Sequence, residues 1–141
     1  MAIAALGLDV GRKRIGVAGC DGLGLLATEL TTIHRTTLEQ DFEAIAQLVA
    51  ARKIETFVVG LPYQMDGTLG KQAKATQKFV RKLQKQFDLP VEYVDERLTS
   101  VAAEEQLKAQ KKYDRRQKGL IDQLAAKIIL QQWLDSRSGK H

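Results

Sequence analysis

The spacing of the apolar residues changes once along this chain, near residue 37, and this change restricts the fold more than any single motif does. Before it, short apolar runs are separated by Gly11-Arg12-Lys13 and by Asp21-Gly22. Both segments favour tight turns, because glycine tolerates a positive φ. Short apolar runs between turns predict strands. We therefore expect an antiparallel meander of three strands, over Ala2–Val10, Ile15–Cys20 and Leu23–Ile33.

After residue 37, apolar residues recur at helical spacing and alternate with short apolar runs. The expected helices span 38–52, 70–87 and Leu120–Leu134, and a further helix is capped by Thr99 or Ser100. The expected strands span Thr56–Val59, ended by Gly60-Leu61-Pro62, and Val91–Val94. The polar segment Lys111–Gly119 is expected to be a loop. Strands that alternate with helices pair in parallel. The predicted fold class is therefore α/β, with a mixed five-stranded sheet and helices on both of its faces.

The composition is typical of a globular protein. The 141 residues are 44% hydrophobic and 28% charged, and a chain of this length can bury one hydrophobic core. No apolar run approaches the ~18–20 residues of a membrane span, and the first residues lack the basic start of a signal peptide. The single cysteine, Cys20, excludes an internal disulfide and a cysteine-rich zinc site. We expect one domain over residues 1–141, located in the cytoplasm.

The charge is unevenly distributed along the chain. Residues 1–70 contain 6 basic and 8 acidic residues, whereas residues 71–141 contain 16 basic and 9 acidic residues. The sequence pI is about 9.4. A basic half of this kind favours a polyanionic partner, such as nucleic acid.

Acidic residues occupy unusual positions in three separate segments. Asp9 interrupts the first apolar run, and Asp95 and Glu96 end the last strand. Asp122 lies on an apolar face of the final helix. Neighbouring residues of a strand point to opposite faces, so only one of Asp95 and Glu96 can share a site with Asp9. Structural roles stay open for each acid: a turn cap for Asp9, an Arg97 partner or helix cap for one of the pair, and the helix dipole for Asp122.

Together, these acids indicate a site for a hard cation. The sequence offers no histidine, cysteine or serine set that would accompany them in another kind of active site. Ligands that are all oxygen favour Mg²⁺ or Mn²⁺ over zinc. Two such ions about 4 Å apart serve phosphodiester hydrolysis, one activating the attacking water and the other stabilising the leaving oxygen.

The expected helix 70–87 carries a row of basic residues. These residues occupy an arc of roughly 100° opposite the apolar side chains, and no acid interrupts them. A solvated helix face usually mixes both signs, so this row is suited to follow a phosphate backbone. The alternative is a face that only keeps the protein soluble. The row consists of Lys71, Lys74, Lys78, Arg81, Lys82 and Lys85.

Two further basic clusters could contact the same ligand. Arg12, Lys13 and Arg14 lie close to Asp9 in the sequence, where cations can hold a scissile phosphate. The other cluster surrounds Tyr113, and basic residues beside an aromatic ring suit single-stranded nucleic acid. A loop of this kind could close over a bound strand. Its members are Lys108, Lys111, Lys112, Arg115, Arg116 and Lys118.

Four segments of the chain resemble the YqgF/RuvX family: LGLDVGRKRIGVAGCD, VVGLPYQMDG, VDERLTS and IDQLAAKIIL. They occur in order, and the resemblance covers nearly the whole chain. The family is similar to the Holliday-junction resolvase RuvC, so the resemblance implies an RNase H-like fold. Its members are described as nucleases that process the ends of the small-subunit ribosomal RNA precursor. The resemblance therefore implies a metal-dependent nuclease that acts on pre-16S rRNA in ribosome biogenesis.

The same resemblance implies which residues form the site. Asp9 would be the acid of the first strand, and Asp122 the acid of the last helix. Glu96 would be the acid of the D-E-R segment, with Asp95 as the alternative ligand. Arg97 and Thr99 would follow this acid. The loop residues beside the site would be Gly11, Gly60, Leu61, Pro62, Asp66 and Gly67.

The chain departs from the resolvase pattern in one respect. RuvC-like enzymes place an acid at the end of the fourth strand and two acids on the last helix. Here the fourth strand ends in Gly60-Leu61-Pro62, and Ala125 follows Asp122 after one helical turn. A three-acid site remains, which favours metal-dependent hydrolysis more than a resolvase activity.

Three other functions stay open. A DNA-junction resolvase would need a two-fold dimer that presents two sites. A binding module in ribosome assembly would have the fold without using the acids. An actin/Hsp70-like ATPase would use the D-V-G-R-K-R-I-G-V segment for phosphate, but that architecture needs two such domains. We expect the nuclease, acting as a monomer or weak homodimer, with Arg12, Lys13 and the basic row of the helix 70–87 holding the nucleic-acid backbone.

Overall fold

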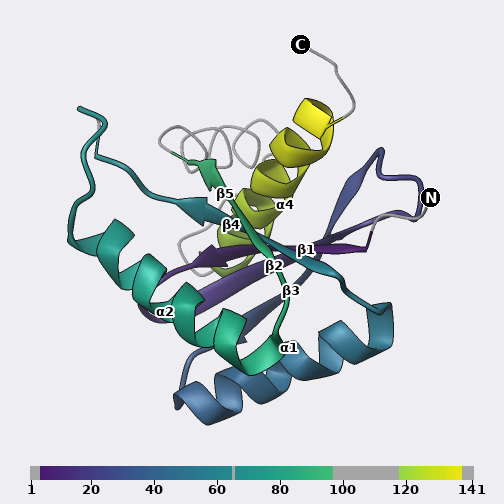
Figure 1. Cartoon of the computed structure of the whole chain (residues 1–141), viewed down its shortest axis with the longest axis horizontal. Helices are drawn as coiled ribbons and strands as arrows, with labels where there is room; N and C mark the ends of the chain where they lie inside the picture. Colours follow the sequence, from purple (N-terminus) through teal and green to yellow (C-terminus); the bar gives the residue numbers. More distant parts are fainter. Residues whose placement is uncertain (1–3, 65, 97–117, 138–141) are drawn as a thin grey trace.

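The computed structural model describes residues 4–64, 66–96 and 118–137. Its centre is one five-stranded sheet with the order β3-β2-β1-β4-β5 (Figure 1). β1 (Ala5–Val10) pairs antiparallel with β2 (Arg14–Cys20) and parallel with β4 (Thr56–Leu61). β3 (Ala27–His34) lies antiparallel beside β2, and β5 (Val91–Asp95) lies parallel beside β4. The predicted mixed sheet is confirmed.

Helices cover both faces of this sheet, as predicted. α1 (Leu38–Arg52) and α2 (Lys71–Phe87) lie on one face, and α4 (Lys118–Arg137) crosses the other (Figure 1). Thr37 caps α1, because its side chain accepts a hydrogen bond from a backbone N–H of the first turn. Within the described part of the chain, no helix is long and apolar enough to cross a membrane.

The face under α1 and α2 is packed with large side chains. Phe42 meets Phe79 edge to face, with ring centroids 5.4 Å apart. Phe57, from the centre of the sheet, meets Phe87 at 5.5 Å. Leu83 of α2 is fully buried in the same cluster. Burial of these rings and branched chains makes this face the main source of apolar stabilisation.

The face under α4 is built differently, because small residues let the helix approach the strands. A Cβ on Gly7 would lie 2.8 Å from the Leu130 Cβ, and a Cβ on Gly16 would overlap the main-chain carbonyl of Asp122. Alanines and the buried Cys20 continue this surface, together with Ile129, Trp133 and other residues of α4. The first turns of α4 are therefore held against the middle of the sheet.

Several predicted boundaries are wrong. β4 continues through Gly60 and Leu61, because these residues pair with Val94 and Asp95 of β5. β3 begins at Ala27 and not at Leu23. The preceding residues form a turn instead, in which Gly24 has a φ of 71° and donates a hydrogen bond to the Asp21 carbonyl. The final helix spans Lys118–Arg137 and is longer than the predicted Leu120–Leu134, so Lys118 and Gly119 belong to it and not to the predicted loop. The helix predicted after Thr99 and the loop over 111–117 lie outside the described residues.

Candidate active site

The alternation of side chains along the strands brings two of the predicted acids to the same face. In β1, Asp9 shares its direction with Ala5 and Gly7, which face α4. In β5, Val94 packs in the cluster under α4, so Glu96 lies on that face as well. The carboxyl ends of the parallel strands lie at the same edge of the sheet, and β1 and β5 are the two neighbours of β4. The carboxyls of Asp9 and Glu96 therefore meet at this edge and form a side-chain hydrogen bond.

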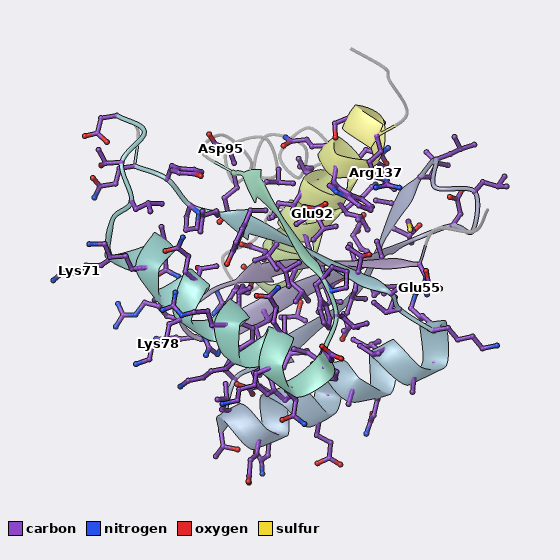
Figure 2. The ribbon with its side chains drawn as sticks, in the orientation of Figure 1. Glu55, Lys71, Lys78, Glu92, Asp95 and Arg137 are labelled. Carbon is purple, nitrogen blue, oxygen red and sulfur yellow. The ribbon has the colours of Figure 1, made fainter. Side chains whose placement is uncertain are left out.

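Asp95 and Glu96 are separated by the same alternation. Glu96 is buried with 9% of its surface exposed, whereas Asp95 is exposed. Figure 2 shows Asp95 at the end of β5, on the outer edge of the sheet. The Glu96 backbone N–H donates to the Leu61 carbonyl at 3.2 Å, which continues the β4–β5 pairing and orients this residue. The structure thus brings Glu96, and not Asp95, together with Asp9.

Burial changes the protonation of the two carboxyls. The pKa of Asp9 is raised from 3.8 to about 6, mainly by burial and then by the negative charge of Asp122, while the hydrogen bond with Glu96 opposes the rise. Burial also raises the pKa of Glu96, to about 9, with further contributions from the charge of Asp9, the hydrogen bond to it and the charge of Asp95. Near neutral pH the two carboxyls consequently hold one proton between them.

Asp122 reaches the site from α4. Its backbone lies over Gly16, the residue opposite Asp9 in the β1–β2 ladder. Its carboxylate does not join the Asp9–Glu96 pair directly. Instead, the Arg14 Nε donates to Asp122 Oδ2 at 2.6 Å. Arg14 belongs to β2 and points to the face of α4, as Gly16 and Ala18 do.

The acidic residues at this edge have the oxygen ligands that a divalent cation prefers, but their side chains are not arranged as a complete metal site. Among the residues that the structure describes, no group of three or more histidine, cysteine or acidic side chains is placed to hold a metal ion. However, Glu96 Oε2 is buried and has no hydrogen-bond partner. A Cβ on Gly60 would come within 2.5 Å of this oxygen, so glycine is needed there to admit the carboxyl. A buried carboxyl oxygen without a partner is costly, and a cation could satisfy it.

The turn beside Asp9 is held by side chains from elsewhere in the chain. The Gly11 N–H donates to the Arg14 carbonyl at 2.8 Å and closes the turn. The Arg35 Nη1 donates to the Gly11 carbonyl at 2.7 Å, and the Gln72 Nε2 donates to the Val10 carbonyl at 3.4 Å. These contacts fix the backbone from which the exposed side chains of Arg12 and Lys13 project.

Sequence reasoning missed Arg35 and Gln72. Arg35 is itself positioned by Asp41, with 3.5 Å between Nε and Oδ2, and by the Phe79 ring, 5.1 Å from its guanidinium carbon. Asp41 is only 3% exposed, which is unusual for an acid in the first turn of a helix. No pattern in the sequence pairs these residues, because the contact depends on how α1, α2 and the turn pack together.

The predicted loop residues have different surroundings. Gly60 and Leu61 are buried in β4, and Pro62 follows them. Asp66 and Gly67 instead lie in an exposed turn. Thr68 donates to Asp66 Oδ1 from its backbone N–H at 3.0 Å and from its hydroxyl at 2.7 Å, and these bonds lower the pKa of Asp66. Asp66 thus has a local role in the turn.

The basic row of α2 is exposed along its whole length. Figure 2 shows Lys71 and Lys78 pointing away from the sheet. The row begins beside the turn, since Gln72 is the residue that binds the Val10 carbonyl. The exposed members are Lys71, Lys74, Lys78, Arg81, Lys82 and Lys85. Other predicted contacts lie outside the described residues, namely Arg97, Thr99, Lys108, Lys111, Lys112, Arg115 and Arg116, and so does Tyr113.

Solved structures share this fold. The RuvC protein of Thermus thermophilus, in complex with a Holliday junction substrate, superposes with a TM-score of 0.62, covering 97% of this chain and 96% of that one at 16% identity. The fowlpox virus resolvase gives a TM-score of 0.56 over 96% and 99% of the two chains, at 10% identity. The RNase H-like fold is thereby confirmed.

Sequence comparisons show the family. Proteins named "Putative pre-16S rRNA nuclease" are 74% identical in Picosynechococcus sp., 63% in Crocosphaera subtropica and 53% in Acaryochloris marina. Each match spans 96% of this chain and 94% of the relative. The family model described as "RuvX: Holliday junction resolvase" matches residues 3–136. The chain therefore belongs to the RuvX family.

Proposed function

We propose that this protein is a divalent-metal-dependent nuclease that processes the ends of pre-16S rRNA. The observation that carries the proposal is the buried carboxyl pair of Asp9 and Glu96, with an unpartnered oxygen on Glu96, at the edge where the parallel strands end. The names of the close relatives support the substrate. A ribosomal precursor as substrate would place the protein in the bacterial cytoplasm.

Asp9, Glu96 and Asp122 are the residues that would hold Mg²⁺ or Mn²⁺. All of their donor atoms are carboxylate oxygens, which both ions prefer. When bound, such a cation supplies an activated nucleophile and charge stabilisation for phosphodiester hydrolysis. The chain must first release the proton that Asp9 and Glu96 share, so cation binding is expected to strengthen as the pH rises.

The basic residues would position the strand. Lys71 begins the row of α2 beside the turn that carries Arg12 and Lys13, because Gln72 fastens the start of α2 to that turn. A nucleic-acid backbone bound along the row would thus arrive at the edge where the acids lie. Contacts to phosphates set position and not sequence, so they suit a precursor RNA as well as DNA.

A second candidate is a DNA-junction endonuclease. The description of the family model favours it. Against it, β4 ends in Gly60 and Leu61 with no acid, and Ala125 is buried at 1% exposure one turn after Asp122. A symmetric junction also calls for two opposed sites in a dimer, and we propose a monomer or weak homodimer.

The decisive experiment compares two labelled substrates in Mn²⁺: a single-stranded RNA that spans a precursor end of 16S rRNA, and a four-way DNA junction. We expect cleavage of the RNA. Asp9→Asn and Glu96→Gln should each reduce the rate about a hundredfold to a thousandfold, on the scale of removing one stabilising group from an active site.

Asp95→Asn is the matched control, because Asp95 is adjacent to Glu96 but lies on the other side of the strand. It should retain most of the activity. Cleavage of the junction alone would move the assignment to the resolvase. RNA binding without cleavage would instead support a binding module in ribosome assembly. Equal loss in Asp95→Asn and Glu96→Gln would contradict the assignment of Glu96.

A further inference from the structure

The ion pair of Arg14 with Asp122 occupies one of the three acids that the proposed function requires. The contact is 2.6 Å long and joins β2 to α4. It is not deeply buried, since the side chains of Arg14 and Asp122 are 27% and 20% exposed. The pair can therefore open without exposing the core, and a ligand from solvent can reach it.

Arg14 lies between the acidic site and the exposed basic turn. Its side chain binds Asp122, whereas its neighbours Arg12 and Lys13 are exposed in the turn. The backbone of this turn is fixed by Arg35 and Gln72. A strand bound along the turn would bring its phosphates close to the guanidinium without rearrangement of the backbone.

Carboxylate and phosphate compete for the same guanidinium. A carboxylate is planar and a phosphate is tetrahedral, but the oxygens of both match the paired N–H donors of arginine. Both form short charge-assisted hydrogen bonds with it. A phosphate that takes Arg14 leaves Asp122 with a free carboxylate beside Asp9, whose pKa is already raised by burial and by the charge of Asp122. Two carboxylates that already interact electrostatically favour the binding of a cation.

We propose that Arg14 is a substrate-responsive gate: it holds Asp122 in the free protein and transfers to a backbone phosphate when nucleic acid binds, which releases Asp122 for the divalent cation. This inference rests on the proposed nuclease function and adds a specific consequence. Nucleic acid and the cation must each increase the affinity of the protein for the other, because the coupling between two sites is reciprocal.

The coupling can be measured in binding experiments on the full chain, without any cleavage. Mn²⁺ binding is followed by electron paramagnetic resonance, with and without a single-stranded 2′-O-methyl RNA whose integrity is checked on a gel. Titration of the RNA alone with Mn²⁺ corrects for ions that the RNA itself binds. The reverse arm measures RNA affinity by fluorescence anisotropy in EDTA and in saturating Mn²⁺. In the wild type we expect both arms to give the same enhancement, about tenfold.

Arg14→Gln tests the gate directly. Without the guanidinium, Asp122 is free at all times, so Mn²⁺ affinity in the absence of RNA should rise about tenfold and the enhancement by RNA should fall toward one. Lys13→Gln is the matched control. It also removes one positive charge, but from the exposed side chain of the residue next to Arg14. It should weaken RNA binding but keep the enhancement. Circular dichroism melting establishes that both variants are folded.

The outcomes separate the two proposals. If wild type binds Mn²⁺ and cleaves RNA through Asp9, yet Arg14→Gln leaves Mn²⁺ affinity unchanged or lowers it, the gate is wrong and the nuclease assignment stands. The gate is also wrong if Lys13→Gln raises Mn²⁺ affinity as much as Arg14→Gln, because the effect is then general electrostatics. If wild type binds no Mn²⁺ at all, both proposals fail.

Discussion

The two faces of the sheet use opposite packing strategies. Under α1 and α2, large side chains such as Phe57 and Leu83 fill a thick apolar layer. Under α4, Gly7 and Gly16 leave no room for a side chain, so the helix backbone itself lies on the strands. Only the second arrangement brings a helix close enough for its Asp122 to act on the pKa of Asp9 in a strand.

This difference indicates a division of labour. The face of α1 and α2 supplies most of the apolar burial and therefore most of the stability. The face of α4 loses some of that burial because glycine and alanine replace larger residues, and it ends in carboxyls that destabilise the metal-free protein. Alanine substitutions on the two faces should accordingly lower stability for different reasons: loss of apolar burial under α1 and α2, and steric collision under α4.

The largest effect on stability is expected from Phe57→Ala. It leaves a cavity beside Phe87 and the other residues of this cluster, so the free energy of unfolding should fall by about 3–5 kcal/mol. Urea denaturation followed by circular dichroism measures the loss. The affinity of the folded protein for Mn²⁺ should not change. Leu23→Ala is the control, because Leu23 is 76% exposed and its truncation should cost less than about 0.5 kcal/mol. An unchanged stability in Phe57→Ala would contradict the assignment of the main core to this face.

A smaller loss is expected from Gly16→Ala, for the opposite reason. The added methyl group would collide with the main-chain carbonyl of Asp122, and a backbone atom cannot rotate away. We expect a loss of about 1–3 kcal/mol, together with weaker Mn²⁺ binding because α4 is displaced from Asp9.

The matched control for Gly16→Ala is Gly22→Ala, since no atom lies within 4 Å of the position its Cβ would take. Gly22→Ala should leave both stability and Mn²⁺ affinity unchanged. Gly16→Ala with normal Mn²⁺ affinity would show that the close approach of α4 is not needed for the site.

The smallest effect is a pH dependence that belongs to the face of α4. The pKa of Glu96 is raised from 4.5 to about 9 in the folded protein, so the folded state binds more protons than the unfolded state between these values. Stability without metal should therefore fall as the pH rises through this window. Each pH unit within this window should lower the free energy of unfolding by about 1 kcal/mol.

Melting temperatures from pH 5 to pH 9, in EDTA and in Mn²⁺, measure this dependence. Glu96→Gln should flatten the curve in EDTA above about pH 6, because Glu96 no longer titrates and only the raised pKa of Asp9 contributes below that pH. Mn²⁺ should flatten the curve of the wild type. Asp66→Asn is the control: Asp66 is exposed and its pKa is lowered, so the slope over this window should persist. A wild-type curve that rises with pH across the window would contradict the raised pKa values of the buried Asp9–Glu96 pair.

Much of this architecture could be predicted from local patterns. The helix over 38–52 and the mixed sheet follow from apolar spacing and turn residues, because these depend on neighbours within a few positions. The end of β4 could not be predicted in this way. Gly60 reads as a terminator, yet pairing with Val94 continues the strand through it, and that pairing joins segments over 30 residues apart.

The candidate site, too, could be predicted in part from local sequence. Acids that interrupt apolar elements single out Asp9 and Asp122, and the alternation of a strand allows only one of Asp95 and Glu96 to accompany them. Their assignment as ligands stays a prediction. The choice of Glu96 on geometric grounds depends on the register of β5 against β4, which local sequence does not specify.

The amino-acid sequence by itself determined the element types, the α/β class and the residues whose chemistry points to a hard cation and a polyanion, because periodicity and residue type are local properties. Only the tertiary structure decided which of these groups meet. The shared proton of Asp9 and Glu96 arises from burial, the hold of Arg14 on Asp122 from the approach of α4 over Gly16, and the fixed turn from the reach of Arg35. Burial and distance are properties of the packed chain, and they are set only when distant segments come together.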